Sequence, residues 1–192
     1  PSWPELKGVL LGCLDAITSA TTDPRQREKL TASCSTIRAE QDLWQAFSHL
    51  KEALGRAEFA AGIRRAVGRS VQAAIPSAYE KLWGMGISGI LTLNVDNFAK
   101  RSFSTVHGGK TVVEFDGLFI QERVLKNSSH FIGNLHGNLE DDRSWVFTKT
   151  DLKKLLRNPR YKLFVQTILS ARTVLFVGIT VDDVAVLRHF EF

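Results

Sequence analysis

The stretch ILTLNVDNFAK, residues 90–100, decides the fold class of this chain. It belongs to a largely apolar run over 87–93, which is typical of a buried strand, and the run ends in the polar residues Asn94, Asp96 and Asn97. An open α/β sheet binds ligands in the crevice beyond the carboxyl ends of its strands. Polar groups at that point therefore indicate a binding site.

Two further apolar segments end in the same way. HFIGNL, residues 130–135, is followed by His136 and Gly137, and TVLFVG, residues 173–178, leads into the stretch that ends at Asp183. Strands with continuous apolar runs, joined by helices, predict a parallel sheet covered on both faces. We therefore predict an α/β, Rossmann-like fold with one site built from these strand ends.

The first half of the sequence predicts helices. A first helix begins at Ser2 and carries apolar residues at helical spacing as far as Ile17. We expect one domain over 1–192, with a helical subregion over about 18–83, inserted after the first helix, and a strand–helix nucleotide-binding core over about 86–192. The other expected elements are a loop or partly helical connection over 18–37, helices over 38–54, 56–83, 151–157 and 160–171, and strands over 87–93, 130–135, 145–147 and 173–177.

The strand ends, in this order, resemble the sirtuin superfamily, and more specifically its sirtuin-like branch of bacterial antiviral NAD hydrolases. That branch typically carries T-T-N-Y-D, L-H-G-S-x-x-D and G-Y-S-x-x-D. The counterparts here are TLNVD (92–96), LHGNLED (135–141) and GITVDD (178–183). The opening PSWPEL resembles the segment after the family's glycine-rich loop. The resemblance therefore implies that the first strand and that loop are missing from this chain and lie upstream of Pro1.

The resemblance also implies roles for individual residues. Asn94 and His136 match the family's catalytic pair, in which the amide positions the ribose and a water and the imidazole acts as a general base. Leu93 and Val95 depart from the pattern, because the family has a threonine and a tyrosine there. The implied nucleotide-binding positions are Thr92, Asp96, Gly137, Gly178, Thr180 and Asp183.

Each assignment has a structural alternative that the sequence leaves open. Asn94 and Asp96 are also suited to capping the helix that follows their strand. His136 is also compatible with a packing role in a turn, and Asp182 or Asp183 with the N-cap of a helix after the last strand.

The activity implied by the resemblance is hydrolysis of NAD+ to ADP-ribose and nicotinamide, used in antiviral defence to deplete NAD in an infected cell (abortive infection). An alternative is a catalytically inactive nucleotide-binding or assembly module, because fold resemblance does not establish activity. A lesser alternative is an NAD-dependent protein deacylase. That class uses four zinc cysteines, whereas this chain has two cysteines in all, and so we expect no metal.

The composition limits the partners. Twenty-five Lys and Arg against 20 Asp and Glu suit an anionic dinucleotide, with no requirement for nucleic acid. The basic stretch 149–162 is explained by a solvated helix face, and a nucleic-acid or partner surface is its alternative.

No stretch approaches the ~20 apolar residues of a membrane span, and two cysteines without a C-x-x-C favour a reducing cytoplasm. The resemblance further implies a homo-oligomer and a regulatory domain or partner subunit of ATPase, Argonaute-like or nucleotide-sensor type.

Overall fold

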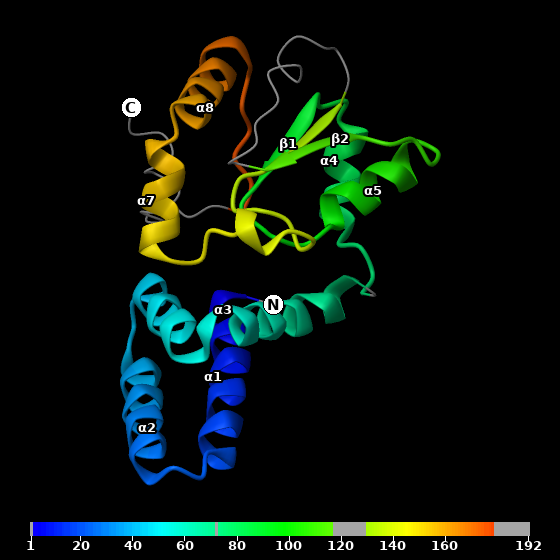
Figure 1. Cartoon of the computed structure of the whole chain (residues 1–192). Helices are drawn as coiled ribbons and strands as arrows, with labels where there is room; N and C mark the ends of the chain where they lie inside the picture. Colours follow the sequence, from blue (N-terminus) through cyan, green and yellow to red (C-terminus); the bar gives the residue numbers. More distant parts are fainter. Residues whose placement is uncertain (1, 72, 117–129, 179–192) are drawn as a thin grey trace.

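The computed structural model describes residues 2–71, 73–116 and 130–178. Figure 1 shows the helices of the N-terminal part beside an α/β part built around a small sheet. The elements are α1 (Trp3–Ala20), α2 (Pro24–Ala39), α3 (Leu43–Val71), α4 (Ser77–Gly84), β1 (Gly89–Thr92), α5 (Phe98–Val106), β2 (Val113–Asp116), β3 (Phe131–Asn134), the 3₁₀ turn η1 (Asp142–Ser144), α7 (Lys149–Arg157) and α8 (Pro159–Ala171).

The described strands form a parallel sheet in the order β1-β3-β2. Helices cover both faces of the sheet. Alternate residues of a strand point to opposite faces, so neighbouring residues of β3 pack against different helices. Ile132 packs with side chains of α4 and α5, including Trp83 and Phe103. Phe131 packs on the other face with side chains of α7 and α8, among them Phe164. The α/β, Rossmann-like prediction with helices on both faces is confirmed.

Gly133, at the centre of the sheet, leaves space for side chains from both neighbouring strands. A Cβ atom at this position would lie 2.6 Å from Cδ2 of Leu91 on β1 and 2.8 Å from Cζ of Phe115 on β2. Both distances are shorter than a van der Waals contact, and a larger residue would therefore push the strands' side chains apart.

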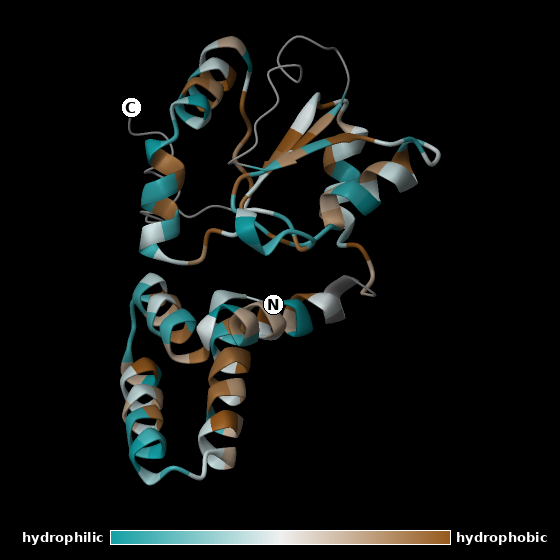
Figure 2. Cartoon of the chain, in the orientation of Figure 1, coloured by the Kyte–Doolittle hydropathy of each residue, from teal (hydrophilic) through white to brown (hydrophobic). Residues whose placement is uncertain are grey.

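The N-terminal helices share one apolar core. The helix start at Ser2 is confirmed, because Ser2 and Glu5 form a capping box. Figure 2 shows apolar residues along much of α1, whereas α2 is largely hydrophilic, and only Cys34 and Ile37 of α2 are buried. The core continues into the α/β part, where Phe147 stacks on Phe47 with ring centroids 5.6 Å apart.

The connection expected over 18–37 is instead mostly the helix α2. Asp23 is the N-cap of this helix, and its carboxylate accepts a hydrogen bond from the backbone N–H of Arg25 at 3.0 Å. Leu30, Cys34 and Ile37 are spaced four and three residues apart and therefore lie on one helical face against α1. The next helix begins at Leu43 rather than residue 38, and it bends at Gly55, where φ is 73°.

Two expected strands are absent from the described part of the chain. Residues 145–147 form a buried loop with no strand pairing, in which the N–H of Val146 donates to the carbonyl of His136. Residues 173–177 are also not a strand, and Leu175 is 63% exposed. An apolar run carries strand propensity, but a strand forms only where a neighbour supplies ladder hydrogen bonds.

Within the described residues, none of the helices combines the length and the apolar composition needed to cross a membrane.

Candidate functional site

The candidate site lies where β1 and β3 end side by side. Thr92 and Asn134 are register partners, and the N–H of Leu135 donates to the carbonyl of Thr92 at 2.8 Å. Asn94 and His136 each follow this registered pair by two residues. Neighbouring strands are about 4.8 Å apart, so both residues leave the sheet at the same edge.

Each of the described strands ends in a buried polar residue. Thr92, Asn134 and Asp116 are register partners across β1, β3 and β2, and they are exposed by 9, 4 and 8%. Buried polar groups are costly unless they form hydrogen bonds, and they tend to be kept where they serve a structure or a ligand. These three residues extend the polar edge of the sheet from β1 as far as β2.

The polar residues of TLNVD form different hydrogen bonds. The backbone N–H of Asn94 donates to the hydroxyl of Thr92 at 3.0 Å, and Nδ2 of Asn94 donates to the hydroxyl of Tyr79 at 3.3 Å. Asp96 accepts from the backbone N–H of Phe98 at 3.0 Å, at the start of α5. The N-cap of α5 is Asn97, which makes no side-chain cap bond, and Asp96 bonds the first N–H of the helix from the residue before the cap. The exposed side chain of Asn94 makes no bond to the helix start in the described structure.

Burial changes the titration of the two acidic groups beside Asn94. It raises the pKa of Asp96, and the hydrogen bond from the Phe98 N–H opposes this only in part. The pKa of Tyr79 is also raised, first by burial and then by the Asp96 carboxylate. The phenol therefore keeps its proton, and Asp96 binds a proton more readily than a solvated carboxyl group does.

His136 is buried and is covered by a residue of the helical part of the protein. His136 is 3% exposed, and the indole of Trp44 on α3 meets the imidazole ring edge-on, with centroids 5.9 Å apart. Gly137 follows with a φ of +91°, and a Cβ there would lie 2.5 Å from the carbonyl oxygen of Ser144. Only glycine fits this turn, because the backbone is left-handed and another chain segment crosses directly beside it.

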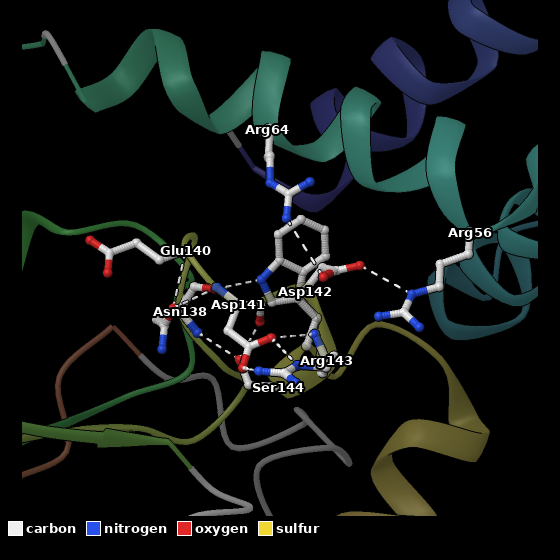
Figure 3. Close-up of polar contacts among 9 residues, drawn as sticks. Arg56, Arg64, Asn138, Glu140, Asp141, Asp142, Arg143 and Ser144 are labelled. Atoms are coloured by element: carbon white, nitrogen blue, oxygen red, sulfur yellow. Dashed lines mark hydrogen bonds and ion pairs between the residues drawn. The ribbon is translucent and has the colours of Figure 1, made fainter.

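The loop after Gly137 is held by hydrogen bonds among its own polar groups and by ion pairs to α3 (Figure 3). The amide oxygen of Asn138 accepts from the N–H groups of Glu140 and Asp141, each at 3.0 Å. Asp142 forms ion pairs with Arg56 at 3.2 Å and Arg64 at 3.6 Å, both from α3. The loop that carries the second half of LHGNLED is therefore attached to the helical part of the chain.

A family model described as a SIR2-like domain matches residues 88–192, which begin just before β1 and include both strand ends of the site. The chain belongs to the SIR2-like domain family. Searches of curated proteins and of solved structures each found no match. Membership supports a sirtuin-related function that is nucleotide-binding or NAD-related.

The third motif of this SIR2-like domain is described only at its first residue. Gly178 is exposed and has a φ of +69°, as a glycine in a tight turn requires. No hydrogen bond in the described structure joins it to the other site residues. Thr180 and Asp183 lie outside the described residues, so their expected roles stay predictions. Among the described residues, no three His, Cys, Asp or Glu side chains form a group that could hold a metal ion.

Four residues at this SIR2-like site were not predicted from the sequence. Asn134 and Asp116 end FIGN and VEFD, and the rule that singled out Asn94 could have found them. Tyr79 and Trp44 gave no such signal, because both sit in helical patterns that are equally typical of core residues.

Proposed function

We propose that this SIR2-like protein hydrolyses NAD+ to ADP-ribose and nicotinamide. The observation that carries the proposal is that Asn94 and His136 follow a registered residue pair on neighbouring parallel strands. An amide and an imidazole at one sheet edge are the groups that this reaction needs, since one orients and the other accepts a proton.

The reaction breaks the bond between the ribose C1′ atom and the nicotinamide nitrogen. The bonding electron pair leaves with nicotinamide, which becomes neutral, and the sugar becomes oxocarbenium-like. Water adds to C1′ and loses one proton, which His136 accepts. Nicotinamide is a good leaving group, and the protein therefore acts mainly by positioning and by electrostatic stabilisation.

The residues of TLNVD supply the positioning. The carboxamide of Asn94 is exposed at the sheet edge and has both donor and acceptor capacity. Asp96 places a carboxyl group beside it, where it can bind a ribose hydroxyl. Gly137, with its positive φ, lets the backbone turn directly after His136. In this proposal Thr92, Gly178, Thr180 and Asp183 bind the nucleotide.

A catalytically inactive nucleotide-binding module is the second candidate, and one observation favours it. His136 is 3% exposed and covered by Trp44, so a substrate reaches the imidazole only if the cover moves. Leu93 and Val95, where the family has polar side chains, favour the same candidate. A deacylase is the lesser candidate, given two cysteines in the whole sequence.

Nicotinamide release from NAD+ by the purified protein tests the proposal. Wild type should release nicotinamide, and Asn94→Ala and His136→Ala should each lower the rate about 10²–10⁴-fold, the usual range for loss of a general base. His107→Ala is the matched control, because His107 lies at the end of α5 and contacts His130, at the amino end of β3. Binding of NAD+ without nicotinamide release by wild type would select the inactive module.

We also propose that the activity serves antiviral defence by NAD depletion, in the cytoplasm. An enzyme that destroys NAD must be held inactive until infection. This requirement supports a regulatory domain or partner subunit and activation by homo-oligomerisation. The expected result is that nicotinamide release per chain rises with protein concentration together with the oligomer fraction measured by light scattering. A rate per chain independent of oligomeric state would contradict this part of the proposal.

A further inference from the structure

The hydroxyl of Tyr79 lies at the centre of the polar residues of TLNVD. It accepts a hydrogen bond from Nδ2 of Asn94 at 3.3 Å, and the backbone N–H of Asn94 in turn donates to the hydroxyl of Thr92. The Asp96 carboxylate lies close enough to raise the pKa of Tyr79. These residues alternate along the chain, at positions 92, 94 and 96. Tyr79 comes from α4, 15 residues before Asn94.

The remaining contacts of Tyr79 hold its ring in place. The ring packs on the apolar cluster of α4, α5 and β3 that includes Trp83 and Ile132. It also lies beside Phe98, with ring centroids 6.1 Å apart. The hydroxyl is therefore presented from a packed helix rather than from a mobile side chain, and it can fix the groups that bond to it.

A carboxamide offers a donor end and an acceptor end, and its partner decides which end faces a ligand. Tyr79 engages the nitrogen of Asn94, so the oxygen is left to accept a hydrogen bond from a water or a ribose hydroxyl. We propose that Tyr79 is a positioning residue of the NAD+ site, which orients the Asn94 carboxamide with its oxygen toward the substrate. This inference rests on the proposed function.

Because the phenol stays protonated, this orientation holds across the neutral range. Burial and the nearby Asp96 carboxylate both raise the pKa of Tyr79. A phenolate would still accept from Asn94 but would repel an ionised Asp96, whereas the neutral hydroxyl is compatible with both neighbours.

Tyr79→Phe tests the inference, because it removes the hydroxyl and keeps the ring against Phe98. In the whole protein, kcat for nicotinamide release should fall about tenfold, which corresponds to about 1.4 kcal/mol in the activation free energy. KM should change by less than about twofold, because lost orientation acts on the reacting water rather than on NAD+ binding. In the Asn94→Ala background the same change should have no further effect, because the carboxamide is already gone.

Phe98→Leu is the matched control, since it disturbs the same ring packing and leaves the hydroxyl in place. It should keep kcat within about twofold of wild type if the hydrogen bond rather than the packing matters. Equal losses in the two variants, a higher KM with unchanged kcat, or full additivity with Asn94→Ala would overturn the inference.

A spectroscopic measurement separates this inference from the proposed function. The side-chain amide resonances of Asn94, identified by their loss in Asn94→Ala, should shift in Tyr79→Phe and not in Phe98→Leu. If wild type releases no nicotinamide, the proposed hydrolase fails, whereas this amide shift still supports the orientation of the Asn94 carboxamide by Tyr79. Unchanged amide resonances in Tyr79→Phe would overturn it.

Discussion

The indole of Trp44 meets the imidazole of His136 edge-on, with ring centroids 5.9 Å apart and the ring planes at 82°. Trp44 belongs to α3 and His136 to the turn that follows β3, so the helical part of the protein covers the proposed general base. Edge-to-face packing of this kind stabilises by about 0.5–1.5 kcal/mol beyond the area it buries.

Replacing Trp44 with alanine should therefore expose His136. We expect diethyl pyrocarbonate to modify His136 slowly in wild type, where the residue is 3% exposed, and several-fold faster in Trp44→Ala. Peptide mapping by mass spectrometry measures each histidine separately. Trp3→Ala is the control, because Trp3 contacts Trp44 and Phe47 in the same aromatic group and makes no ring contact with His136. Equal modification rates in both variants would mean that general loosening exposes the ring.

Gly137→Ala should destabilise the protein strongly. The new Cβ would meet the Ser144 carbonyl oxygen at 2.5 Å in a backbone with a φ of +91°. The left-handed backbone alone costs about 1–2 kcal/mol for a residue other than glycine, and the clash adds to it. Gly109→Ala isolates the first contribution, because Gly109 has a φ of +78° and nothing within 4 Å of its Cβ position. Urea unfolding should show a clearly larger loss for Gly137→Ala, and equal losses would contradict the clash.

The sequence predicts β1 and β3 because buried parallel strands are continuous apolar runs, whereas β2 was not predicted. The runs 87–93 and 130–135 contain β1 and β3, and the polar residues after them lie at one edge of the sheet. That step needs only local pattern and the general rule that parallel strands end together. The part of the site that comes from TLNVD and LHG was predicted for this reason.

The contacts of Tyr79 and Trp44 were not predictable in the same way. Tyr79 reaches Asn94 because α4 packs on one face of the sheet, and Trp44 reaches His136 because α3 packs against the loop region after β3. Both are tertiary facts with no local signal. The run 173–177 is the opposite case, because its apolar residues match the pattern of a buried strand but do not form one in the described structure.

Asp96 should make the stability of the protein depend on pH. An aspartate in the unfolded chain titrates near ~3.9, and burial raises the pKa of Asp96 in the folded protein. The folded form thus binds this proton more tightly. The associated stability is fully present below the unfolded-state pKa and is lost as pH rises through the folded-state pKa.

Asp96→Asn should consequently be at least as stable as wild type at neutral pH, with an advantage that shrinks in acid. The amide oxygen still accepts from the Phe98 N–H, so the start of α5 is kept. Asp141→Asn is a control of opposite sign, because Arg143 lowers the pKa of Asp141, and that variant should lose stability at neutral pH. Urea unfolding at several pH values measures both. A neutral-pH loss in Asp96→Asn would contradict the cost assigned to its burial.

Asp142 connects the loop after His136 to α3 through ion pairs with Arg56 and Arg64 (Figure 3). The arginine side chains are 68% and 47% exposed, so Asp142→Asn should cost less than about 1 kcal/mol of stability. This loss should shrink at high ionic strength, because salt screens exposed charges.

The control for Asp142 is Asp15→Asn, which breaks the exposed Asp15–Arg38 pair within the helical part of the protein. Both variants should lose a similarly small amount of stability in urea unfolding. Only Asp142→Asn should also change NAD+ hydrolysis, because its loop continues directly from His136 and Gly137 and fixes where that turn lies against α3. Equal kinetics in the two variants would mean that the ion pairs of Asp142 hold the surface together without positioning His136.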